Sequence, residues 1–169
     1  TDWALPENMM IAEPLKEKLG AVKDLAKGIK ASHSNLEAAR WGDVILLSIK
    51  PQIMGHVLEE IKPEVNDKKL ILSVAAGITT SFIEKKLDGN VPVVRAMPNI
   101  AAVVRESATA ICEGKFATKA DLEVARHIFE SVGIVVDVEA PAAICSALFR
   151  CLGVEVGRLL RRNMLAHDR

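Results

Sequence analysis

The residues of this chain that could do chemistry come directly after short apolar runs. Lys50, Asn99 and the small residues at 75–77 each follow such a run. A lysine ammonium can pair with a phosphate or a ribose, an asparagine amide can hold a polar group, and a small side chain lets a flat ring approach the backbone. Each feature also has a simpler interpretation: a surface lysine, a turn cap, and a tight turn into a helix.

The apolar runs are the elements that must position these residues. Segments 43–51, 70–74 and 93–97 are short, apolar and separated by helix-sized stretches, a spacing typical of right-handed βαβ units. The first of them reads as a strand that is buried on both faces. Because the carboxyl ends of parallel strands meet at one edge of a sheet, Ser48 to Pro51, Ala75 to Gly77 and Pro98 to Asn99 should line one crevice.

The remaining elements alternate in the same way. Further strands are predicted at 8–12, 29–32, 108–112 and 134–138, the last two antiparallel. Helices are predicted over 15–28, after capping boxes at 34–37 and 81–84, from Pro51, from Thr118 to Gly133, and from 142 onward. The fold class is therefore α/β, a Rossmann-like and mostly parallel sheet with flanking helices that ends in a carboxyl-terminal helix.

Two more side chains could contact a nucleotide. Glu13 ends the first predicted strand, where an acidic residue accepts hydrogen bonds from an adenosine ribose and repels a 2′-phosphate; it could equally be a solvated turn charge before Pro14. Asn35 either touches the adenine side or caps its helix.

Composition excludes several functions. The 169 residues carry no net charge, which argues against nucleic acid or an anionic membrane as the main partner. Three cysteines fit neither a zinc spacing nor a disulfide framework, and favour a reducing, cytoplasmic setting. Neither a membrane-spanning run nor a signal peptide is recognised. No G-x-G-x-x-G and no Ser/His/Asp or paired-carboxylate arrangement occurs, so no catalytic residue and no metal site are predicted.

Five motifs in order resemble pyrroline-5-carboxylate reductase: SIKP at 48–51, SVAAGIT at 73–79, FIEKKL at 82–87, VVRAMPN at 93–99 and VVRESAT at 103–109. The likeness extends from about Pro6 to Glu139. It implies an enzyme of proline biosynthesis that uses NADPH or NADH to reduce 1-pyrroline-5-carboxylate, a small molecule, to L-proline. It also implies a dinucleotide-binding domain followed by a helical domain through which subunits dimerise.

The resemblance also implies a set of site residues. Asn99 lies on the substrate side, and Glu13 stands in the segment that senses the 2′-phosphate, which favours NADH in this chain. The implied cofactor-binding residues are Ala12, Glu13, Pro14, Asn35, Ser48, Ile49, Lys50, Pro51, Val74, Ala75, Ala76 and Gly77.

The chain departs from the family pattern in three places. The family's MPNTP is MPNIA here, which replaces a threonine hydroxyl with Ile100. The family's first strand and glycine-rich loop are not found, so the expected sheet is incomplete at its first strand. Three explanations are open: 8–12 pairs directly with 44–49, another chain supplies a strand, or the sequence is a truncated record of a longer gene. After Glu139 the likeness fails. We therefore divide the chain into a dinucleotide-binding domain at 1–139 and a carboxyl-terminal helix at 140–169, the start of a missing or divergent dimerisation domain. The alternative hypothesis is a non-catalytic remnant that binds nucleotide weakly or acts as an interaction module.

Overall fold

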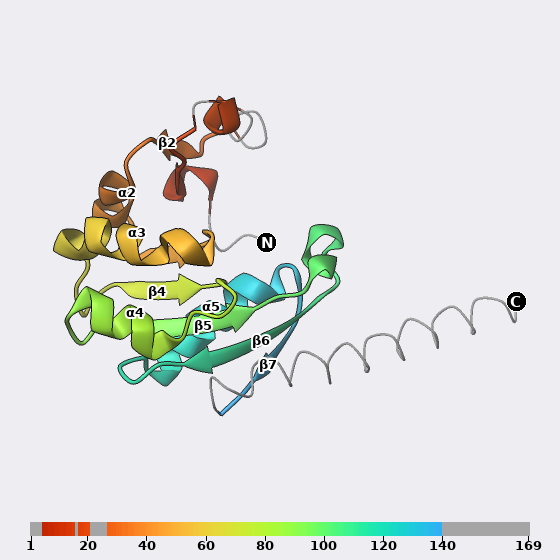
Figure 1. Ribbon diagram of the computed structural model, residues 1–169. Coiled ribbons are helices and arrows are strands. Elements are labelled where there is room, and N and C mark those ends of the chain that lie inside the picture. The colour runs from red at the N-terminus through yellow and green to blue at the C-terminus, as the bar shows by residue number, and fades with distance from the viewer. Residues whose placement is uncertain (1–4, 16, 21–26, 140–169) are drawn as a thin grey trace, which may run out of the picture.

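The computed structural model describes residues 5–15, 17–20 and 27–139. Its larger sheet has five strands in the order β3-β4-β5-β6-β7 (Figure 1). The strands are β3 (Val44–Leu47), β4 (Leu70–Ser73), β5 (Val93–Met97), β6 (Ser107–Glu113) and β7 (Gly133–Asp137).

The strand directions confirm the predicted class. β3, β4 and β5 are parallel, β6 pairs antiparallel with β5, and β7 pairs parallel with β6. Both late strands therefore run opposite to the first three, as predicted. The helix predicted from 142 onward lies outside the described residues.

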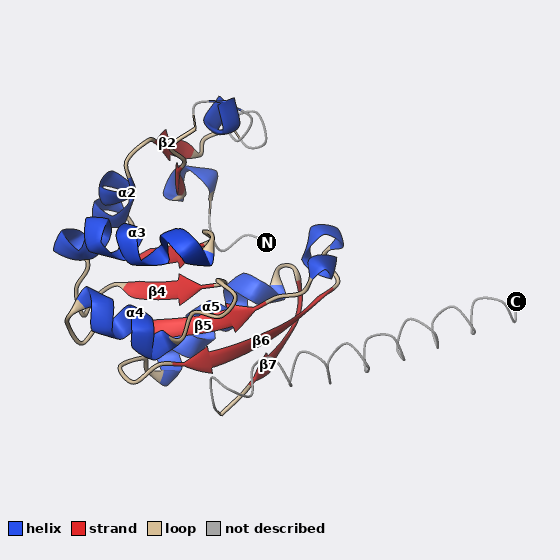
Figure 2. Cartoon of the chain, in the orientation of Figure 1, coloured by secondary structure: helices blue, strands red, loops and turns tan. Residues whose placement is uncertain are grey.

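Helices cover both faces of this sheet (Figure 2). One face packs against α3 (Met54–Ile61) and α4 (Thr80–Leu87), in a cluster that includes Leu58, Ile71 and Ile83, all 0% exposed. The other face packs against α5 (Lys119–Glu130), whose Ala125 and Phe129 belong to one apolar cluster with residues of β4, β5 and β6. Burial of this kind contributes about 25 cal/mol per Å² of apolar surface, and it holds the strand ends in place.

A second, smaller sheet lies apart from the first. β1 (Met10–Ala12) and β2 (Lys30–Ser32) pair in parallel, and α2 (Asn35–Trp41) packs both on β1 and on α3. β1 does not pair with β3, so the predicted direct pairing of 8–12 with 44–49 is not found.

β3 is consequently an edge strand, and the prediction that it is buried on both faces is wrong. Ile45 and Leu47 pack toward α3, whereas Val44 and Leu46 on the opposite face are 39% and 49% exposed. The helix on that opposite face, α5, packs on β5, β6 and β7. A short apolar run therefore predicts the strand correctly, but it cannot show whether other elements cover both of its faces.

Helix starts agree with the sequence in two places and differ in a third. Ser34 caps α2 by accepting the Glu37 N–H, and Thr118 caps α5 in a reciprocal capping box with Asp121. The capping box predicted at 81–84 is wrong, because α4 begins two residues earlier and the Thr79 hydroxyl accepts the Phe82 N–H at 3.1 Å.

Two residues, Ile53 and Gly133, have positions that differ from those the sequence predicts. Ile53 lies in a 3-10 turn, η2 (Pro51–Ile53), and is 47% exposed, while Met54 takes the inward place. Gly133 does not end α5, which stops at Glu130; Gly133 begins β7 with a φ of 152°.

We predict that Thr79→Ala lowers the free energy of unfolding by about 1 kcal/mol, because the α4 start loses its side-chain acceptor. The matched control Ser81→Ala, at a position exposed on the same first turn, should change it by less than about 0.5 kcal/mol. Urea unfolding of the two variants checks this, and equal effects would show that Thr79 is not the cap.

We predict that Gly133→Ala is severely destabilising, by about 3 kcal/mol. A Cβ at this position would overlap the backbone of Ser107 in β6, and the positive φ disfavours any side chain. Gly89→Ala is the control, since its Cβ would meet only Val91 at 3.7 Å. A Gly133→Ala chain as stable as Gly89→Ala would contradict the close β6–β7 approach.

Candidate functional site

The predicted crevice residues follow three strands that end at the same edge of the sheet, with β5 running two residues beyond its last pair with β4, to Met97. The pairing places Leu47, Ser73 and Arg95 side by side in β3, β4 and β5. The segments that come next, 48–51, 74–77 and 98–99, therefore extend from the same edge of the sheet, as predicted. Their roles in binding remain predictions.

The end of β3 presents a cation. Ser48 and Lys50 are exposed, and Ile49 packs partly into the core. The Lys50 ammonium has no ion pair among the described residues, and its carbonyl oxygen accepts the Ile53 N–H at 3.2 Å. Pro51 opens η2 immediately afterwards. The backbone of the β3 end therefore presents an exposed positive charge at this edge.

The turn that follows β4, residues 74–77, exposes its backbone. The Val74 N–H donates to the Leu47 carbonyl at 3.3 Å, and buried Ala75 donates to the Ser73 hydroxyl at 3.4 Å. Ala76 and Gly77 are exposed, and Gly77 has a φ of 75°. No atom lies within 4 Å of where a Gly77 Cβ would stand. A planar group can therefore approach this turn closely.

The end of β5 is held by Asn99. Its Oδ1 accepts the Ala101 N–H at 3.1 Å and caps the 3-10 helix η4 (Ile100–Val104), and its own N–H donates to the Ser107 hydroxyl at 3.3 Å. The interpretation of Asn99 as a turn cap is therefore correct for its Oδ1 atom. The Nδ2 group keeps no partner among the described residues and remains available to a ligand.

Residues 12–14 end β1, in the smaller sheet. Ala12 is half-buried, Pro14 is exposed, and the Glu13 Oε1 accepts the Leu15 N–H at 3.0 Å. The Glu13 carbonyl accepts from His33 Nδ1 at 3.0 Å. Glu13 is therefore a turn-forming residue, and one carboxylate oxygen stays without a described partner.

Asn35 has a structural contact that sequence reasoning missed. Its Nδ2 donates to Glu60 Oε2 at 2.9 Å and joins α2 to α3. The capping interpretation for Asn35 is wrong, because Ser34 is the cap. Asn35 therefore helps to hold the smaller sheet against the larger one.

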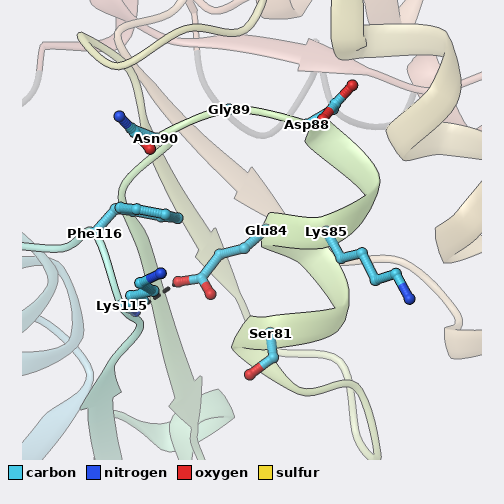
Figure 3. A pocket seen from close by; sticks show the side chains of 8 residues that line it. All are labelled: Ser81, Glu84, Lys85, Asp88, Gly89, Asn90, Lys115 and Phe116. Carbon is cyan, nitrogen blue, oxygen red and sulfur yellow. Dashed lines mark hydrogen bonds between the residues drawn. The ribbon is translucent and has the colours of Figure 1, made fainter.

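A shallow hollow of about 520 Å³ lies elsewhere, beside the end of β6 (Figure 3). Within it, the buried Glu84 carboxylate accepts the Lys115 N–H at 2.6 Å and so ties α4 to the loop after β6. None of the predicted site residues lines this hollow. Its lining consists of Ser81, Glu84, Lys85, Asp88, Gly89, Asn90, Lys115 and Phe116.

Two negative findings concern the described part of the chain. It contains no cluster of three or more His, Cys, Asp or Glu side chains that could hold a metal ion. None of its helices is both long enough and apolar enough to span a bilayer.

Comparison with known proteins agrees with this geometry. A family model described as NADP oxidoreductase, coenzyme F420-dependent, matches residues 2–77. The pyrroline-5-carboxylate reductase of Methanosarcina acetivorans is 43% identical over 135 residues, which is 79% of this chain and 49% of that protein. Pyrroline-5-carboxylate reductase 3 of Xenopus laevis is 35% identical over 133 residues, 79% of this chain and 48% of that protein. The chain thus spans about half the length of the curated relatives it matches.

Solved structures agree as well. A pyrroline-5-carboxylate reductase from Coxiella burnetii superposes with a TM-score of 0.78 at 32% identity, over 82% of this chain and 52% of that one. The pyrroline carboxylate reductase of Plasmodium falciparum, solved with NADP bound, superposes with a TM-score of 0.71 at 27% identity, over 92% and 58%. The resemblance seen in the motifs is therefore confirmed, and the chain is a relative of the pyrroline-5-carboxylate reductases over the half of their length that it matches.

Proposed function

We propose that this chain forms the cofactor-binding part of a pyrroline-5-carboxylate reductase, which reduces 1-pyrroline-5-carboxylate to L-proline with NADPH or NADH. The observation that supports this most directly is the coincidence of two findings. The chain is 43% identical to such a reductase, and the family-like motifs at 48–51, 73–79 and 93–99 converge on one edge of the sheet. Residues 1–139 form the cofactor domain in this proposal, and 140–169 begin a further domain.

The residues at the edge fit a nicotinamide dinucleotide. Lys50 supplies a cation, unpaired among the described residues, for a phosphate or ribose. The exposed turn at 75–77 leaves room for a planar ring. The Asn99 Nδ2, which has no partner among the described residues, supplies a hydrogen-bond donor. When bound, the reduced nicotinamide would supply the hydride for the imine carbon, and a proton must reach the imine nitrogen.

The chain's own part in this reaction is positioning. The β4 turn sets the depth of the ring plane, because its backbone is fixed by hydrogen bonds to Leu47 and Ser73. Lys50 fixes the charged end of the ligand. No described side chain combines burial and geometry to act as the acid, so we assign none.

Two further features support related proposals. Cys112 is a free, buried thiol, in keeping with a reducing, cytoplasmic setting. Ile100 and Val103 in η4 are 91% and 86% exposed, and apolar residues exposed together favour association with a second copy of the chain.

One observation favours the second candidate function, a weak nucleotide-binding or interaction module without activity. The smaller sheet, which contains Glu13, is not hydrogen-bonded to β3. Within the described part of the chain, the adenosine side of the site is held against the larger sheet chiefly through the packing of α2 on α3.

Turnover separates the two functions. The 169-residue chain and the full-length product of its gene are each mixed with 1-pyrroline-5-carboxylate and NADPH or NADH, and the loss of reduced-nicotinamide absorbance is followed. We expect the full-length protein to form L-proline. Binding of nucleotide without turnover by the full-length protein would favour the module and reject the reductase.

We predict that Lys50→Gln weakens the affinity of the chain for NADPH and NADH about tenfold, because a charge-assisted contact is lost. Titration followed by reduced-nicotinamide fluorescence measures this. Lys68→Gln is the control, since Lys68 is also exposed but precedes β4, at the opposite end of the strands. Equal weakening by both substitutions would show that Lys50 has no specific contact.

We predict that Glu13→Gln shifts the ratio of the NADPH and NADH dissociation constants toward NADPH by roughly fivefold, because a negative charge near the 2′-phosphate is removed. Glutamine keeps an oxygen acceptor for the Leu15 N–H, so the turn is preserved. Glu113→Gln is the control, because Glu113 is exposed and pairs with Val94 near the start of β5, away from the strand ends that form the site; it should leave the ratio unchanged. An unchanged ratio in Glu13→Gln would place Glu13 away from the cofactor.

A further inference from the structure

Ser107 and Thr109 are buried hydroxyl side chains at the start of β6. They are 1% and 0% exposed, and their hydroxyl oxygens share a hydrogen bond at 3.2 Å. Because side chains alternate along a strand, both point to the same face of β6. That face packs on α5, since Ile111, two residues further on, belongs to the same apolar cluster as Ala125. Two hydroxyls are therefore kept at the edge of an apolar cluster, where a polar group is unfavourable unless it is hydrogen-bonded.

The Ser107 hydroxyl has a second partner, and this partner belongs to the candidate site. Its Oγ accepts the Asn99 N–H at 3.3 Å, across the loop that joins β5 to β6. The Asn99 Oδ1 accepts the Ala101 N–H at 3.1 Å, and the Asn99 carbonyl accepts the Ala102 N–H at 3.2 Å. The Nδ2 group of Asn99 makes no hydrogen bond to a described residue and is not buried. It is therefore a donor whose direction is set by the other polar groups of the same residue.

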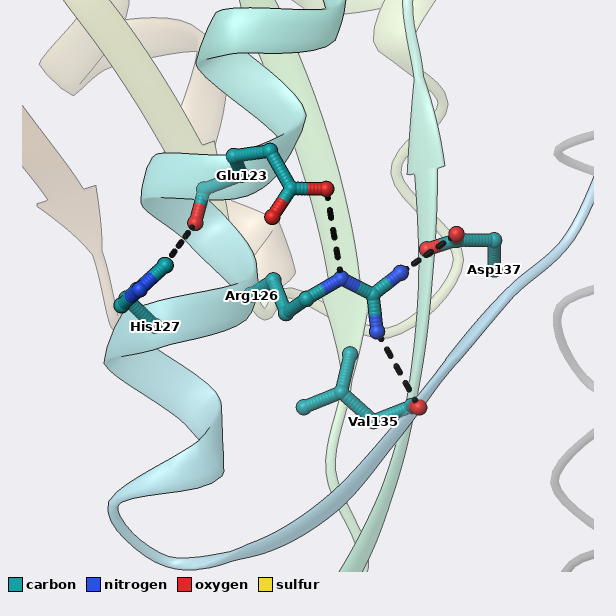
Figure 4. Close-up of polar contacts among 5 residues, drawn as sticks. All are labelled: Glu123, Arg126, His127, Val135 and Asp137. Carbon is teal, nitrogen blue, oxygen red and sulfur yellow. Dashed lines mark hydrogen bonds and ion pairs between the residues drawn. The ribbon is translucent and has the colours of Figure 1, made fainter.

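The backbone of Ser107 is held from its other side. Its N–H donates to the Val132 carbonyl at 2.8 Å, and Ser107 begins the pairing of β6 with β7. β7 is in turn tied to α5, because Arg126 donates to the Val135 carbonyl at 3.4 Å and contacts the Asp137 carboxylate (Figure 4). The Ser107 hydroxyl is therefore a fixed acceptor for the loop that follows β5.

The strand order places Asn99 on the substrate side of the proposed complex. Lys50 follows β3, the turn at 75–77 follows β4, and Asn99 follows β5, which is the next strand in the sheet. A cofactor with its charged end at Lys50 and its ring at 75–77 leaves Asn99 on the side of the ring that faces away from Lys50. This side is open to a small substrate that must meet the ring.

We propose that Ser107, supported by Thr109, is a positioning residue for the substrate. It fixes Asn99 so that the Nδ2 group donates a hydrogen bond to the carboxylate of 1-pyrroline-5-carboxylate. A hydrogen bond to a carboxylate is stronger than one between neutral groups. A donor that is already held in place loses little conformational freedom on binding, so affinity depends on a serine that does not touch the substrate. The inference rests on the proposed reductase function and adds a residue to the same site.

Steady-state kinetics of the full-length gene product test the proposal. We expect Ser107→Ala to raise the KM for 1-pyrroline-5-carboxylate about fivefold, while kcat and the Kd for NADPH change by less than about twofold. A general loss of structure would not be confined to the substrate KM. Thr118→Ala is the control, because it removes the cap of α5 beyond the far end of β6. It should lower stability and leave the KM unchanged.

A double-mutant cycle shows whether Ser107 acts through the Asn99 amide. Asn99→Ser keeps an oxygen that can cap η4 but lacks the Nδ2 donor, and it should raise the KM about tenfold. Adding Ser107→Ala should then raise the KM further by less than about twofold. A further fivefold rise, or an unchanged KM in Ser107→Ala alone, would overturn the proposal while leaving the reductase function intact. A wild-type protein without turnover would reject that function, and this inference with it.

Amide hydrogen exchange in the 169-residue chain tests the structural step without any activity. The Asn99 N–H should exchange at least about threefold faster in Ser107→Ala than in the wild type, because its acceptor is lost. Thr109→Val keeps the shape of the side chain and removes its hydroxyl, so it should have a smaller effect in the same direction and serves if Ser107→Ala does not fold. Exchange at the wild-type rate in both variants would overturn the proposal.

Discussion

The parallel hydrogen-bond register of β3, β4 and β5 is the constraint on which the rest of the structure depends. It aligns Leu47, Ser73 and Arg95, and thereby brings three loops from distant parts of the chain to one edge. The apolar clusters beneath α3, α4 and α5 fix this register, because a shift by one residue would turn every buried side chain to the other face. Lys50, the turn at 75–77 and Asn99 owe their proximity to that packing.

The same strand order leaves β3 as an edge strand of the larger sheet. β3 has a paired edge toward β4 and an unpaired edge toward the smaller sheet, and Val44 and Leu46 remain exposed beside it. The two sheets are joined by side chains, chiefly Asn35 to Glu60 and Arg40 to Glu64 at 2.7 Å, instead of by a backbone ladder. Contacts of this kind are weaker than a strand pair, so the nicotinamide half of the proposed site is better fixed than the adenosine half.

The sequence predicts the strands well because their apolar runs are short and punctuated by Gly, Pro and Asp. β5 agrees residue for residue, and the capping residues Ser34 and Thr118 are confirmed. The predictions that are wrong concern features that depend on tertiary packing. Thr79 and Ser81 are chemically alike, and only the packing of α4 decides which one caps the helix.

The site shows the same limit. Glu13 and Asn99 both follow strand ends, as predicted, and each accepts a local backbone N–H. For Asn99 the turn cap is one of two interpretations of the sequence, whereas for Glu13 the sequence indicates only a solvated charge or a ribose contact.

Hydrogen–deuterium exchange of the 169-residue chain with and without NADPH tests the central claim most directly, namely that the shared edge of β3, β4 and β5 binds the nicotinamide cofactor. We expect protection confined to peptides that contain 48–51, 74–77 and 98–101. Protection at the hollow around Glu84 and Phe116, or binding that leaves the edge unprotected, would contradict it.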